Sequence, residues 1–217
     1  MFLGVARGSV EEPKLIHLAY VPDDKEAAAR APVCFVGKAI TFDSGGLSLK
    51  PSDAMIDMKT DMAGSAAVLG AMRVISWMKP KFPVHAFMGA CENMPSGNAY
   101  RLGDVLTSRL GKTVEITNTD AEGRLVLGDI LSYANELKPA AMIDLATLTG
   151  APYMYQATLT QNIDFALLWR GFAYDCHYIS SVIDLHRHGD DPLPHYSEST
   201  RLTVRRGRSS SRLQIAE

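Results

Sequence analysis

The strongest constraint on the fold is an alternation of short apolar runs with longer segments of helical periodicity across residues 1–150. Apolar residues recur every three or four positions at 61–78, which predicts a helix that ends near Lys79-Pro80. A second helix is expected at 125–137. Strands that alternate with helices favour an α/β fold, with a mostly parallel central sheet flanked by helices. The expected strands, all rich in aliphatic or β-branched residues, are 15–20, 32–36, 84–90, 113–117 and 141–146.

Charged residues follow two of the expected strands. Lys38 and Asp43 come after the second strand, which the sequence predicts to end at Gly37-Lys38. Asp120 and Glu122 lie between the fourth strand and the second helix. Ligand sites of parallel sheets lie beyond the carboxyl ends of the strands. We therefore expect these side chains to gather at one edge of the sheet.

Two further charged residues join this group: Asp61 at the start of the long helix, and Lys50 shortly after a double glycine. The set then holds four carboxylates and two lysines. Four carboxylates cannot all stay ionised close together without compensating positive charge. Two divalent cations would supply that charge, because oxygen ligands suit Mg²⁺, Mn²⁺ and Zn²⁺. A lysine that binds a metal must be neutral, and adjacent cations lower its pKa enough to allow this.

Each of these segments, taken alone, also fits a purely structural role. Lys38 and Asp43 fit a solvated surface turn. Asp61 fits a helix N-cap, where a carboxylate meets the positive end of the helix dipole. The acids before Arg124 fit the first turn of a helix, with the arginine as an ion-pair partner. The residues by themselves leave these alternatives open.

Composition argues against several function classes. The chain has 22 lysines and arginines against 24 acids, whereas a broad nucleic-acid surface usually needs a strongly basic domain. No apolar stretch approaches the roughly 18 to 20 residues that span a bilayer, and the first residues show no secretory signal. Three widely spaced cysteines without a CxxC pair argue against a disulfide scaffold. These features predict a cytoplasmic protein with no membrane partner.

The composition changes towards the end of the chain. All nine lysines lie at or before Lys138, whereas residues 139–217 contain seven arginines and no lysine. Residues 201–217 combine five arginines with a run of serines and show no periodicity. Two interpretations stay open for residues 152–217: a disordered basic tail, or a segment that leaves the parent reading frame.

Five segments resemble one enzyme family in order and spacing. NTDAEGRL at 118–125 is similar to the signature of the leucyl aminopeptidase (cytosol aminopeptidase) family. The resemblance covers roughly residues 13–151, with Ala39 and Leu102 where the family usually has glycine and proline. The other four segments are VGKAITFDSGGLSLKP at 36–51, KTDMAGSAAVLGAM at 59–72, AYRLGDVLT at 99–107 and IDLATLTGA at 143–151.

The resemblance implies a two-metal aminopeptidase that releases N-terminal residues, with a leucine-type preference, from peptides with a free N-terminus. The implied cofactors are two Mn²⁺ or Zn²⁺ ions. Lys50 would be catalytic and polarise the scissile carbonyl, and Arg124 would hold a bicarbonate ion that acts as a general base. The implied metal ligands are Lys38, Asp43, Asp61, Asp120 and Glu122, and the implied substrate-binding residues are Thr147, Leu148 and Gly150.

The resemblance also bears on domain organisation and assembly. Residues 1–151 would form a partial aminopeptidase catalytic domain, incomplete relative to the family, and residues 152–217 an unmatched C-terminal segment. Family members usually carry an N-terminal domain ahead of the matched segment, which we do not expect here. They usually form homo-hexamers, a state that is doubtful for this chain because surfaces for it are expected to be missing. Two alternatives to the enzyme stay open: a non-catalytic scaffold or DNA-binding accessory protein on the same fold, and an inactive fragment.

Overall fold

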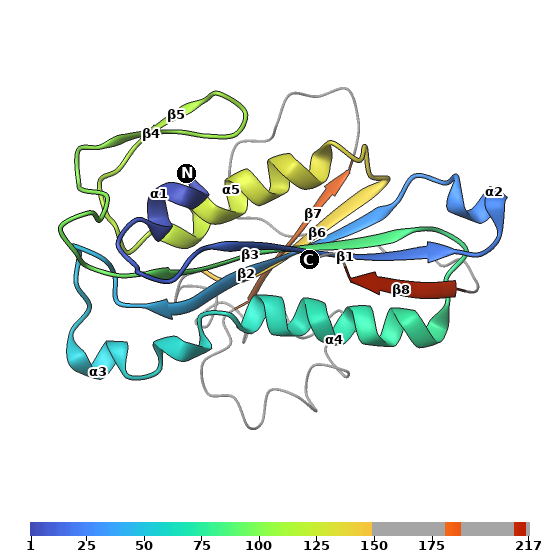
Figure 1. Cartoon of the computed structure of the whole chain (residues 1–217), viewed down its shortest axis with the longest axis horizontal. Helices are drawn as coiled ribbons and strands as arrows, with labels where there is room; N and C mark the ends of the chain where they lie inside the picture. Colours follow the sequence, from blue (N-terminus) through green and yellow to red (C-terminus); the bar gives the residue numbers. More distant parts are fainter. Residues whose placement is uncertain (149–180, 188–210, 216–217) are drawn as a thin grey trace, which may run out of the picture.

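The computed structural model describes residues 1–148, 181–187 and 211–215, and these form a twisted six-stranded sheet with helices on both faces (Figure 1). The strand order is β7-β6-β2-β3-β1-β8. The three central strands β6, β2 and β3 run parallel, whereas β1, β7 and β8 are antiparallel to their neighbours. The strands are β1 (Lys14–Pro22), β2 (Val33–Asp43), β3 (Val84–Asn93), β6 (Ala141–Thr147), β7 (Ser181–Arg187) and β8 (Ser211–Ile215). The expected α/β class, with a parallel centre and flanking helices, is confirmed.

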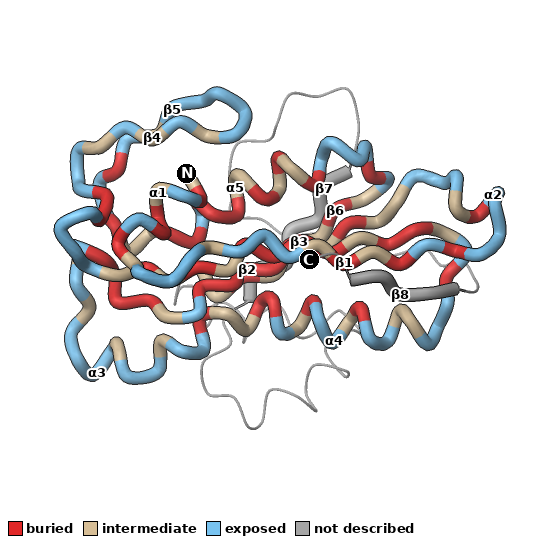
Figure 2. Tube along the Cα trace, in the orientation of Figure 1, coloured by how far each residue is buried: buried red, intermediate tan, exposed pale blue. Residues whose placement is uncertain are grey.

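Two apolar cores lie on opposite faces of the sheet. Helix α4 (Ala63–Met78) covers one face, and α5 (Glu122–Asn135) covers the other together with α1 (Phe2–Ala6) (Figure 1). Alternate residues of the central strands therefore point into different cores, which makes these strands buried on both sides (Figure 2). Phe87, Val126 and Ile130 belong to the α5 core, and Ala39, Val68, Met72 and Met88 to the α4 core.

The register of β2 and β3 brings their carboxyl ends together. The pairing runs from Val33 opposite Val84 to Asp43 opposite Asn93, with a shift between Ile40 and Phe42. Strand β2 thus continues past Gly37-Lys38, where the sequence predicted its end. That prediction was wrong because the lysine side chain is buried with partners from other segments, which keeps a charged residue tolerable within a central strand.

The strand expected at 113–117 forms, but outside the central sheet. It is β5 (Thr113–Glu115), which among the described strands pairs only with β4 (Val105–Thr107), in a two-stranded antiparallel sheet. Alternation predicts a strand without identifying its partner. The loop after β5 still reaches the edge of the central sheet, because α5 begins at Glu122 and packs on β2.

Three short elements complete the described fold: α2 (Lys25–Ala28), α3 (Ser52–Met55) and the 3-10 helix η1 (Met58–Thr60). The last two lead from the end of β2 into α4. Among the described helices, none is both long and apolar enough to cross a bilayer. Cys34 and Cys91, the two cysteines in the described part of the chain, are buried free thiols.

Candidate metal centre

Lys38 lies within β2 and its side chain is almost fully buried, with 3% exposed. Its Nζ is 2.7 Å from both carboxylate oxygens of Asp61 and 2.9 Å from Glu122 Oε1. It also donates a hydrogen bond to the carbonyl oxygen of Thr147 at 2.9 Å. Gly123 gives this side chain its room, because a Cβ there would lie 2.6 Å from Lys38 Cε. A buried ammonium group is stable only with such close partners.

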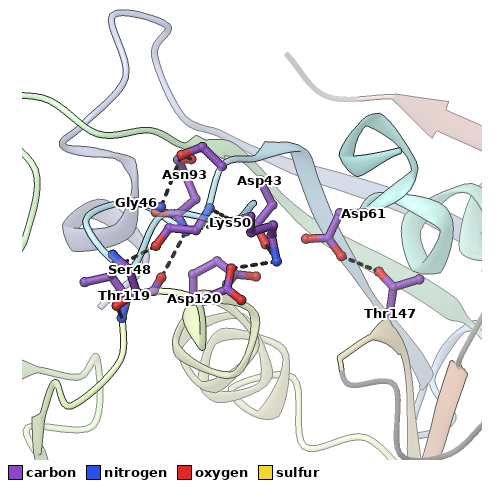
Figure 3. A network of polar contacts seen from close by, with 12 residues as sticks. Asp43, Gly46, Ser48, Lys50, Asp61, Asn93, Thr119, Asp120 and Thr147 are labelled. Carbon is purple, nitrogen blue, oxygen red and sulfur yellow. Dashed lines mark hydrogen bonds and ion pairs between the residues drawn. The ribbon is translucent and has the colours of Figure 1, made fainter. Parts of the chain in front are cut away.

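Asp61 comes from the end of η1, just before α4. The residue at the N-cap position of α4 is Met62, and no side chain caps the helix. The Asp61 carboxylate is directed to Lys38 and accepts a hydrogen bond from Thr147 Oγ1 at 2.7 Å (Figure 3). The helix-cap alternative is therefore wrong for this residue.

Lys50 forms a second, less buried cluster at the end of the loop that follows β2 (Figure 3). Its Nζ lies 2.6 Å from Asp120 Oδ1 and 3.1 Å from Asp43 Oδ2. The lysine side chain is 15% exposed and that of Asp120 is 32% exposed. The surface-turn alternative is therefore wrong for Lys38 and Asp43, since both are buried in ion pairs.

Three carboxylates could hold a cation between the two lysines. One oxygen from each of Asp43, Asp120 and Glu122 lies within 4.8 Å of the others. Glu122 Oε2 is buried and has no hydrogen-bond partner among the described residues. A buried carboxylate oxygen without a donor is costly, and a bound cation would compensate it. These three ligands are carboxylate oxygens, which suit divalent cations.

The pKa shifts show which buried charges lack a sufficient opposite charge nearby. Burial raises the pKa of Glu122 to about 7, with Lys38 opposing the rise and Asp43 and Asp61 adding to it. Burial also raises the pKa of Asp61, in part offset by Lys38. For Lys38 and Lys50 burial would lower the pKa, but their ion pairs outweigh it and raise the pKa of both. Without a metal the lysines carry the positive charge of this site, and four carboxylates still exceed two ammonium groups.

The remaining sequence candidates lie in different surroundings. Thr147 contacts both Lys38 and Asp61, as described above. Leu148 is half-buried and packs against the α5 core. Arg124 is exposed on α5 and makes no ion pair within residues 1–148. Gly150 lies outside the described residues.

A polar network beside the carboxylates was missed by the sequence analysis. Asn93 donates to Asp43 Oδ1 at 2.8 Å, and the Thr119 hydroxyl connects the loop after β2 to the loop before α5 (Figure 3). The strand expected at 84–90 continues to Asn93, the last residue of β3, and the rule that sites lie at the carboxyl ends of strands could have found this residue.

The sequence matches the cytosol aminopeptidase family, catalytic domain, over residues 1–165. The chain belongs to the cytosol aminopeptidase family. The match begins at the first residue and extends past the boundary expected near residue 151. The two clusters of ion pairs described above lie inside the matched region.

Curated relatives support the same family. The chain is 49% identical over 191 residues to a probable cytosol aminopeptidase of Burkholderia ambifaria, covering 88% of this chain and 36% of the relative. It is 55% identical over 167 residues to one of Aquifex aeolicus, covering 75% and 33%. A third, from Alkaliphilus oremlandii, is 58% identical over 150 residues, covering 69% and 30%. The chain thus spans about a third of the length of these cytosol aminopeptidases.

Proposed function

We propose that this member of the cytosol aminopeptidase family binds two divalent metal ions, Mn²⁺ or Zn²⁺, at the carboxyl edge of its sheet. The observation that carries the proposal is the convergence of four carboxylates on two lysines, with Glu122 Oε2 buried and unpartnered. The proposed ligands of one ion are Lys38 and Asp61, that of the other is Asp120, and Asp43 and Glu122 are shared.

The proposed reaction is the hydrolytic release of an N-terminal residue, of leucine type, from a peptide with a free N-terminus. When bound, the two ions would supply Lewis-acid polarisation of the scissile carbonyl and of the attacking water. The ion pairs of Lys50 with Asp43 and Asp120 raise its pKa in the metal-free chain, and its ammonium group would donate to the carbonyl oxygen as negative charge develops there. Its partial exposure leaves it accessible to a substrate.

The proposal also assigns roles to residues around the metal centre and divides the chain into two regions. Thr147, Leu148 and Gly150 would line the substrate site, and Arg124 would hold a bicarbonate ion. The exposed guanidinium of Arg124 supports this role, because it makes no ion pair within residues 1–148. Residues 1–151 would be the partial catalytic domain and residues 152–217 a separate C-terminal segment, in a cytoplasmic protein.

Hydrolysis of leucine p-nitroanilide by the purified chain, with and without Mn²⁺, tests the proposal. We expect Mn²⁺-dependent turnover that is lost in Lys50→Ala and retained in Lys112→Ala, an exposed lysine outside both clusters. Calorimetric titration with Mn²⁺ separates the two parts of the proposal. A chain that binds Mn²⁺ without turnover would refute catalysis and favour a scaffold. A folded chain that binds no Mn²⁺ would refute the metal centre itself.

A further inference from the structure

Asn93 occupies a fixed and fully buried position beside the proposed ligands. It ends β3, has 0% exposure, and lies opposite Asp43 in the register of β2 and β3. Its backbone carbonyl accepts hydrogen bonds from both the amide and the hydroxyl of Ser44, at 3.0 and 2.7 Å. The backbone of Asn93 is therefore anchored independently of its side chain, so a side-chain substitution leaves these bonds in place.

The Asn93 side chain connects two segments that carry candidate ligands. Nδ2 donates to Asp43 Oδ1 at 2.8 Å and to the carbonyl oxygen of Thr119 at 3.0 Å. Asp43 ends β2, whereas Thr119 directly precedes Asp120 in the loop before α5. The amide group of Asn93 thus joins the end of β2 to the loop before α5 at the carboxylate cluster, and the Thr119 hydroxyl joins the same loop to Gly45 and Ser48 (Figure 3).

The two oxygens of Asp43 have different partners. Oδ1 accepts hydrogen bonds from Asn93 Nδ2 and from the Gly45 amide at 2.9 Å. Oδ2 lies 3.1 Å from Lys50 Nζ. Because Oδ1 is held by two donors, the rotation of the carboxylate is fixed and Oδ2 is directed towards Lys50 and the neighbouring carboxylates.

The amide of Asn93 has one satisfactory orientation. If its oxygen and nitrogen were exchanged, the oxygen would face a carboxylate and a carbonyl, neither of which can donate. In this orientation Oδ1 is buried without a hydrogen-bond partner among the described residues, and the glycine at position 46 leaves it room, because a Cβ there would lie 2.9 Å from Oδ1. The orientation of the amide is therefore set by the two acceptors of Nδ2.

We infer that Asn93 is a positioning residue for the metal centre, which holds Asp43 and the loop before α5 in the geometry that the ions require. The inference rests on the proposed function, because Asn93 would act on the metal ions through Asp43, a proposed ligand. Partners that orient metal ligands typically change metal affinity by about 10- to 100-fold when they are removed.

The first test is Mn²⁺ affinity of the purified chain by calorimetric titration. We expect Asn93→Ala to weaken binding by about 10- to 100-fold. Tyr100→Phe is the matched control, because it removes one hydrogen bond to the Thr119 carbonyl, at 2.7 Å, and leaves that of Asn93. We expect the control to bind within a few-fold of wild type. Equal affinities for Asn93→Ala and wild type would overturn the inference.

Thermal unfolding separates positioning from a merely structural role. If Asn93 positions the metal ligands, Asn93→Ala reduces the rise in Tm that Mn²⁺ causes. If its role is merely structural, Asn93→Ala lowers Tm equally with and without Mn²⁺. If Asn93→Ala does not fold, Asn93→Ser, whose hydroxyl can donate to one acceptor at a time, takes its place in both measurements. Unchanged affinity in the serine variant would then overturn the inference.

Amide hydrogen exchange tests Asn93 without a metal. We expect the amides of Gly45 and Lys50, which bond to Asp43 Oδ1 and to the Ser44 carbonyl, to exchange faster in Asn93→Ala. Wild type that binds no Mn²⁺ would refute the proposed centre, and the exchange rates would still decide the role of Asn93. Unchanged rates in this loop would show that Asn93 does not hold it.

Discussion

Lys38 and Lys50 lie near each other in sequence, yet the fold gives them different surroundings. Each ammonium group lies between two carboxylates, but Lys38 is 3% exposed and Lys50 is 15% exposed. Lys38 also donates a hydrogen bond to the Thr147 carbonyl oxygen, in addition to its two carboxylate partners. The comparison shows that the same residue type can serve inside a strand as a buried counter-charge and in a loop as a partly exposed one.

The largest expected effect separates the two lysines by stability. We predict that Lys38→Ala lowers the free energy of unfolding of the metal-free chain by about 3–5 kcal/mol, because Asp61 and Glu122 are left buried together without a cation. Lys50→Ala should cost about 1–2 kcal/mol, since solvent partly compensates its partners. Urea unfolding in EDTA measures both values. Equal losses would show that the difference in burial has no energetic consequence.

A smaller effect concerns the pH dependence of the Lys38 cluster. Burial raises the pKa of Glu122 from 4.5 in the unfolded chain to about 7, even with Lys38 beside it. Folding thus favours the protonated form of Glu122. The resulting contribution to the free energy of unfolding is complete below about pH 4.5 and is lost as the pH rises through about 7.

Glu122→Gln isolates this contribution. We predict that the metal-free wild type loses stability relative to Glu122→Gln between pH 4.5 and 7, by on the order of 1–3 kcal/mol. The difference between the two proteins is needed because burial lowers the pKa of His85 to about 4, which gives the opposite slope below pH 6.5. If the free energies of unfolding of the two proteins changed in parallel with pH, the charge of Glu122 would be compensated without a metal.

The extent of β2 shows what local sequence rules cannot supply. The glycine and lysine at 37 and 38 suggested the end of a strand, but the strand continues to Asp43. The charge of Lys38 is compensated by Asp61 and Glu122, which are distant in sequence. A rule that examines neighbouring residues cannot find partners that only the tertiary fold brings close, whereas the apolar runs predicted the four strands 15–20, 32–36, 84–90 and 141–146.

The buried face of α4 likewise could not be predicted from the local sequence. The apolar residues of this helix include Leu69 and Met78, which are exposed, as well as Val68 and Met72, which form the core contact. Apolar residues occur on several sides of the helix, so the period identified the element but not its face. Asn93 was missed for a related reason, since its importance depends on the register that places it opposite Asp43.

The smallest expected effect on stability is at Arg124, a cation outside both lysine clusters. Its guanidinium is exposed and makes no ion pair within residues 1–148. We therefore predict that Arg124→Gln changes the free energy of unfolding by no more than about 0.5 kcal/mol, below the cost at either lysine. A loss as large as that of Lys50→Ala would show that the arginine has a structural partner.

Activity should respond to this substitution even though stability does not. If Arg124 holds bicarbonate, added bicarbonate should stimulate leucine p-nitroanilide hydrolysis by wild type and not by Arg124→Gln. Arg73→Gln is the matched control, because Arg73 is an exposed helical arginine on α4, on the other face of the sheet. Stimulation that persists in Arg124→Gln would reject the anion site. Stimulation lost in both variants would show a general charge effect, because the two arginines lie on opposite faces of the sheet.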